Sequence, residues 1–170
     1  SACDRFVMHN RTDGVCDTSL DSESPDDKGF GNSLKVDITT LSDLSTSDNE
    51  GVISTYFEGQ DLQQIRKGTS EALPLTLSFW VRSPKTGIHI VELYDFDSST
   101  QRFVSAPYTI ALANTWQLVE HTFPADTTAG KISGGLEVVG GVAKTFAPGP
   151  GTIVGTGLDV LSTGIDMFAG

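Results

Sequence analysis

The 170-residue chain has few cysteines and histidines, two of the former and three of the latter. Its two cysteines, Cys3 and Cys16, are too few for a disulfide framework, and without a clustered pair of histidines they do not make a zinc site. They could close one small loop near the N-terminus or remain as two thiols. No GxSxG nucleophile elbow is present, and no glycine-rich stretch joins a strand to a helix as in a phosphate-binding loop. These absences argue against nucleophilic hydrolysis and phosphate binding.

Long apolar runs and basic residues are also scarce. No stretch is long enough to span a bilayer, and the N-terminus lacks the basic region and apolar core of a signal peptide. The chain has 11 basic against 22 acidic residues and a formal net charge of −11. Because such an acidic surface repels phosphate backbones and anionic lipid, we expect neither nucleic-acid binding nor membrane insertion. The charge itself favours solubility.

What the chain has instead is alternation of apolar and polar residues, most clearly in Leu73–Ser83. Successive side chains of a strand point to opposite faces, so this segment is predicted to be a half-buried β-strand. Its apolar side comprises Leu73, Leu75, Leu77, Phe79 and Val81, and its other side comprises Thr76, Ser78, Trp80 and Arg82.

Similar segments recur along the chain and predict an all-β fold. Pro107 lies inside one of them and indicates an edge strand or a bulge, because proline donates no hydrogen bond to a ladder. Asp61–Lys67, closed by Gly68, is predicted to be one short helical turn, and Gly31 and Gly68 are expected at turns that need positive φ. The further predicted strands are 3–9, 29–39, 52–58, 88–94, 102–110, 116–123, 136–142 and one or two within 158–168.

An expected total of about eight or nine strands favours one antiparallel jelly-roll β-sandwich over residues 1–170. Residues 10–28 are expected to form a polar loop, and residues 143–157, rich in glycine and proline, an irregular segment. The acidic run DSESPDD at 21–27 lacks the ligand spacing of an EF-hand. We therefore expect no cofactor, with a structural Ca²⁺ as the open alternative.

Four blocks carry a resemblance to a known family: GFGNSLKVDITT, FEGQDLQQIRKGTS, LTLSFWVRSPKTGIHIVELYD and YTIALANTWQLVEHTFPADTTAG. Together they resemble a domain of structural proteins of tailed bacteriophages, especially marine ones, and the final STGIDMFAG resembles its closing strand. That domain is similar to the jelly-roll carbohydrate-binding modules attached to polysaccharide-degrading enzymes.

The resemblance implies a non-enzymatic virion structural protein, a fibre, spike or capsid decoration, on the surface of the phage particle. It implies as partners other virion proteins, a host-surface glycan and further copies of the chain. A cyclic homo-oligomer, most simply a trimer, is expected. The family has no agreed catalytic residues, so none is carried over and no enzymatic activity is expected.

The candidate contact residues for a glycan or a sister subunit are Trp80, Arg82, Tyr94 and Tyr56. Carbohydrate-binding sandwiches stack exposed aromatic rings on sugar faces beside hydrogen-bonding side chains. If these residues share one open face, they form such a platform, and the alternative function is a carbohydrate-binding module. Glu92 and Glu120 could also face one sheet surface, as the carboxylate pair of a glycosidase does at about 5 to 10 Å.

Overall fold

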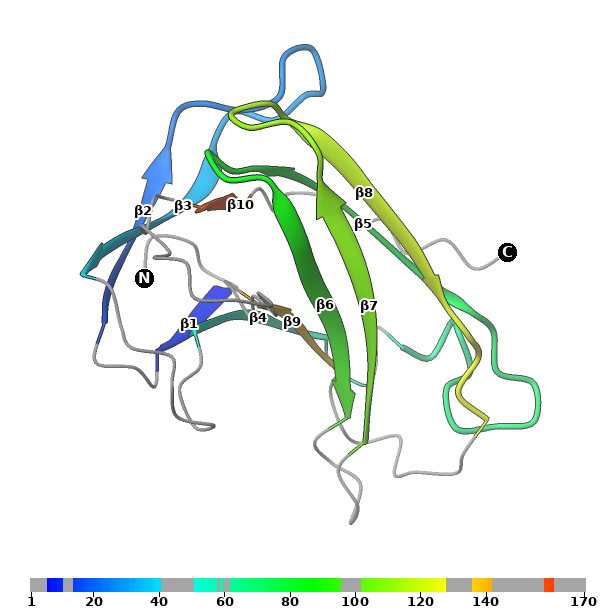
Figure 1. The fold of residues 1–170 in the computed structure, drawn as a ribbon. Helices are drawn as coiled ribbons and strands as arrows, with labels where there is room; N and C mark the ends of the chain where they lie inside the picture. The colour runs from blue at the N-terminus through cyan, green and yellow to red at the C-terminus, as the bar shows by residue number, and fades with distance from the viewer. Residues whose placement is uncertain are drawn as a thin grey trace.

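Two antiparallel β-sheets packed face to face form the protein (Figure 1). The computed structural model describes residues 6–10, 14–40, 51–57, 59, 62–95, 102–127, 136–141 and 158–160. The first sheet contains, in spatial order, β1 (Phe6–Asn10), β4 (Gly51–Phe57), β9 (Leu136–Gly141), β6 (Gly87–Asp95) and β7 (Arg102–Ile110). The second sheet contains β2 (Val15–Asp21), β3 (Ser33–Thr40), β10 (Leu158–Val160), β5 (Leu75–Arg82) and β8 (Gln117–Phe123).

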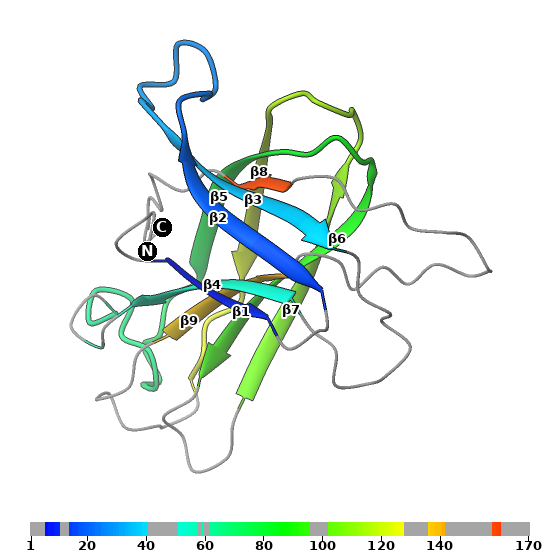
Figure 2. The same cartoon turned by 90° about the vertical axis from the view of Figure 1, so that its left-hand side faces the viewer.

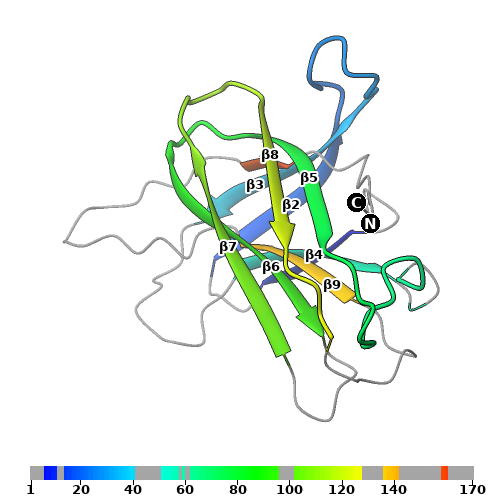
Figure 3. The ribbon, with the colours of Figure 1, turned by 90° about the vertical axis from the view of Figure 1, so that its right-hand side faces the viewer.

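The predicted antiparallel jelly-roll β-sandwich is confirmed. The strand at Arg102–Ile110 has its predicted bounds and is an edge strand, as Pro107 indicates. Figure 2 shows β1 and β2 together at one edge of the sandwich, and Figure 3 shows β7 and β8 at the opposite edge. The described residues include no helix that could span a membrane.

Three local expectations need correction. Residues 15–21, predicted to be loop, form β2, an edge strand whose side chains are mostly exposed and so carry little apolar periodicity. Residues 62–71 form consecutive turns, with Arg66 N–H donating to the Gln63 carbonyl, rather than a helix. Positive φ occurs at Gly68, as predicted, but at Gly29 rather than Gly31. Cys3 and residues 143–157 lie outside the described residues, and Cys16 is a free thiol.

The core between the sheets consists of two neighbouring clusters joined by Phe79 and Tyr108. One cluster surrounds Leu77 and Leu93, the other surrounds Val36 and Val81, and both aromatic rings pack against both clusters. Phe79 of β5 and Tyr108 of β7 meet edge to face, with ring centroids 5.4 Å apart and an interplanar angle of 86°. Burial raises the pKa of Tyr108 to about 12. This contact fixes which face of each sheet is internal.

We predict that Phe79→Ala lowers the free energy of unfolding by about 3 to 5 kcal/mol, because it removes the ring that bridges the two clusters. Phe103→Ala is the matched control, since Phe103 is 68% exposed, and it should cost less than about 1 kcal/mol. Urea denaturation measures both. Equal losses would show that the internal face of β5 is wrongly assigned.

Candidate functional site

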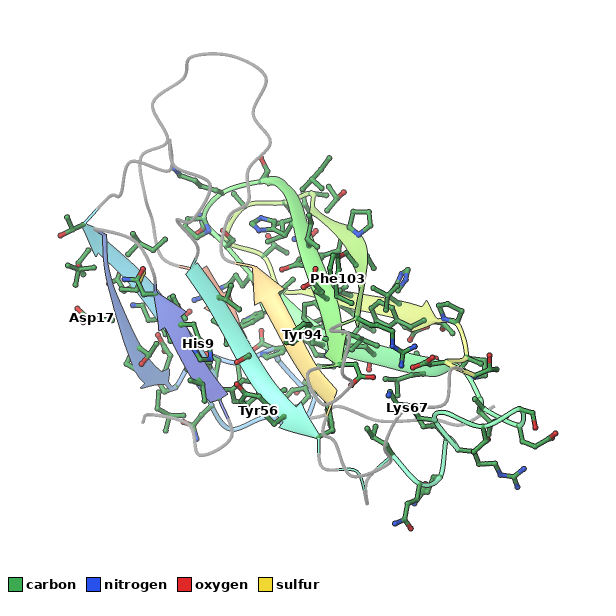
Figure 4. All side chains as sticks on the ribbon, turned by 90° about the horizontal axis from the view of Figure 1, so that it is seen from below. His9, Asp17, Tyr56, Lys67, Tyr94 and Phe103 are labelled. Atoms are coloured by element: carbon green, nitrogen blue, oxygen red, sulfur yellow. The ribbon has the colours of Figure 1, made fainter. Side chains whose placement is uncertain are left out.

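The outer face of the first sheet presents aromatic side chains from three strands. On β4, β6 and β7 the core-facing positions are occupied by buried residues such as Ile53, Leu93 and Ala106. Strand alternation therefore directs Tyr56, Tyr94 and Phe103 to the opposite side. Figure 4 shows the three side chains following one another across this face.

The register of the ladders places these three residues in one row. Tyr56 and Tyr94 both pair with position 137 of β9, one from each side, and Tyr94 pairs directly with Phe103. Tyr56 and Tyr94 are thus two strand spacings apart, about 10 Å, whereas Tyr94 and Phe103 are nearest neighbours about 5 Å apart. Tyr56 is 44% exposed and Tyr94 is half-buried. We call Tyr56, Tyr94 and Phe103 the aromatic row.

A polar pair lies on the same face, one row further along the strands. Glu92 of β6 pairs with Ser105 of β7, and the Ser105 hydroxyl donates a hydrogen bond to Glu92 Oε2 at 2.6 Å. Each of these residues is two positions from Tyr94 or Phe103 on the same strand, so its side chain points to the same face and lies next to the aromatic row. The face therefore combines flat apolar rings with a carboxylate and a hydroxyl that can exchange hydrogen bonds with a ligand.

Trp80 and Arg82 lie on the other side of the molecule. Both belong to β5 and point outward from the second sheet, because Leu77, Val81 and their neighbours occupy the internal positions. The structure thus does not bring the four predicted contact residues together: Tyr56 and Tyr94 share one outer face, and Trp80 and Arg82 share the opposite one. Single-strand alternation shows which residues point away from the core but not which sheet a strand joins.

Trp80 and Arg82 already have intramolecular contacts. Lys28 Nζ lies 5.7 Å from the centroid of the Trp80 ring, and the Arg82 guanidinium lies 5.1 Å from the centroid of the Trp116 ring. Arg82 also forms an ion pair with Glu23. The segment between β2 and β3 therefore contributes side chains that engage this face.

The structure also bears on two other candidate sites from the sequence, the Glu92–Glu120 carboxylate pair and the acidic run at 21–27. Glu92 lies on the outer face of the first sheet and Glu120 on the outer face of the second, so they do not form the carboxylate pair of a glycosidase. Within the described residues, which include the acidic run 21–27, no group of three or more histidine, cysteine, aspartate or glutamate side chains could hold a metal ion.

Sequence reasoning did not select Phe103, Glu92 or Ser105 as partners of the tyrosines. The sequence does contain a signal for Phe103. It lies an odd number of residues from Ala106 and Tyr108 along β7, so its side chain points to the opposite face of the strand. Its place beside Tyr94, however, depends on the pairing of β6 with β7, which the segment alone does not determine.

Comparison with known proteins supports the fold. No protein-family model matches the sequence, and no curated protein sequence is similar to it. The enzymatically active domain of tailspike protein 4 of bacteriophage CBA120 matches with a TM-score of 0.61 and 13% identity, over 93% of this chain and 18% of that chain. This chain thus spans under a fifth of that tailspike structure.

Carbohydrate-binding modules are structurally similar over almost their full length. The family 11 module of a cellulosomal cellulase of Clostridium thermocellum has a TM-score of 0.58 at 12% identity, over 98% of this chain and 88% of that chain. A family 4 module has a TM-score of 0.55 at 12% identity, over 96% and 86%. At these identities the similarity establishes the fold, a β-sandwich of the carbohydrate-binding-module type.

We predict that Arg82 and Trp116 are energetically coupled by about 0.5 to 1 kcal/mol, because the guanidinium lies over the indole ring. A double-mutant cycle of Arg82→Ala and Trp116→Ala, measured by urea denaturation, gives this coupling free energy. A cycle of Arg82→Ala with Leu118→Ala serves as the control. Strictly additive losses for Arg82 and Trp116 would contradict the contact.

Proposed function

We propose that this protein is a non-catalytic carbohydrate-binding β-sandwich that holds a glycan across the outer face of its first sheet. The observation that carries the proposal is the aromatic row, in which Tyr56, Tyr94 and Phe103 lie in register across the first sheet, with β9 between Tyr56 and Tyr94. Aromatic rings supply flat apolar surfaces, and the tyrosine hydroxyls add hydrogen-bonding groups at the ring edges.

The surroundings of the row favour a neutral glycan. Glu92 and Ser105 lie next to the row and can exchange hydrogen bonds with sugar hydroxyls. The formal net charge of −11 disfavours acidic polysaccharides through long-range repulsion. A row that crosses several strands suits a chain of sugar rings rather than a single monosaccharide.

Binding without hydrolysis is supported by the placement of three acidic side chains that the structure describes. Glu92 is close to the aromatic row, but the second strand carboxylate considered from sequence, Glu120, is on the opposite outer face. Asp95, at the end of β6, points inward and is 7% exposed. None of these three side chains therefore pairs with another across the row, as acid and base do in glycoside hydrolysis.

We predict that Tyr94→Ala weakens glycan binding at least tenfold, because Tyr94 is the central ring of the row. Affinity electrophoresis through gels containing mixed-linkage β-glucan or xylan measures the loss, and a Tyr56→Ala variant should weaken binding in the same direction. Trp80→Ala is the matched control on the opposite face and should migrate as the unmodified protein does. Loss of retardation in Trp80→Ala, with Tyr94→Ala unaffected, would assign binding to the second sheet instead.

A second proposal concerns the setting of this activity. The tailspike match and the resemblance to tailed-phage structural proteins support a virion protein, a fibre, spike or capsid decoration on the particle surface. Exposed Leu112 and Leu118, near the β8 edge, offer apolar contacts for a homo-oligomer such as a trimer or for another virion protein. The aromatic row would then bind a host-surface glycan.

Immunogold labelling of purified phage particles, with antibody raised against this chain, tests the virion proposal. We expect gold on the capsid or tail, and its position distinguishes a decoration protein from a fibre. Unlabelled particles, with the antigen in the soluble fraction, would contradict the virion role and leave a carbohydrate-binding module of a secreted enzyme as the setting.

A further inference from the structure

A half-open cavity of about 500 Å³ lies at one end of the sandwich, between β7 and the segment that follows β8. Figure 1 shows β7 and β8 close together at the upper end of the sandwich and apart at the lower end. The cavity lies between the two sheets, whereas Tyr56 and Tyr94 lie on the outer face of the first sheet. Phe103 is the one member of the aromatic row that also borders the cavity.

The walls of the cavity are side chains of the hydrophobic core. Leu75, Leu93 and Phe123 line it and belong to the buried cluster, and Leu73 packs against them. Val104 occupies a core-facing position of β7 but is 40% exposed, because β8 does not cover it there. When an apolar molecule displaces water from such apolar walls, the free energy of the system falls, which favours binding.

One side of the cavity is formed by a network of four charged side chains. Lys67 Nζ donates to Asp95 Oδ2 at 2.9 Å and lies 3.5 Å from Asp126 Oδ2. Arg102 donates to both oxygens of Asp126, at 2.9 Å each, and to Asp95 Oδ2 at 3.0 Å. The hydrogen bond to Asp126 raises the pKa of Arg102, with a further contribution from Asp95.

The network restricts what the cavity can hold. Among the residues that the structure describes, the two cations and two carboxylates of the network balance in charge, so a charged ligand would add an uncompensated charge to a partly buried place. The observed contacts leave further N–H donors of Arg102 unused, and these can donate to a neutral oxygen. Pro107 in edge strand β7 lacks an N–H, which disfavours the addition of a peptide strand along this edge.

We propose that this cavity binds a neutral amphipathic small molecule, with a ring or branched apolar body against Leu93 and Phe123 and a hydroxyl or carbonyl oxygen toward Arg102. Its volume is within the range of small-molecule pockets, about 300 to 1,000 Å³, and an apolar lining with a few convergent polar groups is typical of them. This cavity shares only Phe103 with the aromatic row, and ligand binding in it does not depend on glycan binding.

The test uses the neutral fluorophore 6-propionyl-2-(dimethylamino)naphthalene, whose carbonyl oxygen can accept a hydrogen bond from Arg102, and the full chain. We expect saturable binding at one site per chain, and at least tenfold weaker binding in Val104→Trp, whose indole would fill the opening. Ala125→Trp fills the cavity from the segment after β8 and should weaken binding similarly. Ile88→Trp is the matched control, because Ile88 is 63% exposed on the outer face of β6 and does not line the cavity.

Far-ultraviolet circular dichroism and urea denaturation verify that each variant is folded before binding is measured. Absence of saturable binding to the unmodified protein would overturn the proposal, as would unchanged dissociation constants in both Val104→Trp and Ala125→Trp. Retardation of Val104→Trp by polysaccharide should equal that of the unmodified protein. A failure of the cavity proposal is therefore distinguishable from a failure of glycan binding.

Discussion

The contact between Phe79 and Tyr108 is the interaction on which the arrangement of both outer faces depends. It joins β5 of the second sheet to β7 of the first and lies between the two halves of the core. Because side chains alternate along a strand, an inward Phe79 places Trp80 on the outside of the second sheet. In the same way, an inward Tyr108 places Ser105 and Phe103 on the outside of the first sheet.

The hydrogen-bonded ladders then extend this assignment from β7 across the first sheet. Phe103 pairs with Tyr94, and Tyr94 and Tyr56 meet the same position of β9, so residues almost 50 positions apart in sequence become one row. The two outer faces consequently differ in chemistry. One presents tyrosine and phenylalanine rings beside Glu92 and Ser105, and the other presents Trp80 with Lys28 over its ring.

The sequence alone predicts the class of fold and which side chains of an individual strand point toward the core. The alternation in Leu73–Ser83 correctly separates buried Leu77 and Val81 from outward Trp80, because one face of this strand is covered by the other sheet. The polar edge strand β2 was missed, because an edge strand with mostly exposed side chains needs no apolar period. Its place in the fold is determined by pairing with β3 instead.

The candidate site was predictable only in part, for a related reason. Tyr56 and Tyr94 could be recognised as outward aromatic residues, but their grouping with Phe103 rather than with Trp80 follows from non-local strand pairing. The charge network and its cavity also combine distant segments, since Lys67, Arg102 and Asp126 come from three separate parts of the chain. Local periodicity contains no information about such pairings.

The central claim, that the aromatic row is the glycan-binding surface, is tested most directly by nuclear magnetic resonance titration of the protein with a mixed-linkage β-glucan tetrasaccharide. The account predicts chemical-shift changes concentrated at Tyr56, Tyr94, Phe103 and their neighbours on β4, β6 and β7, with the indole N–H signals of Trp80 and Trp116 unchanged. Shifts confined to the two indoles, or no shifts at millimolar oligosaccharide in this and a xylan-derived series, would contradict it.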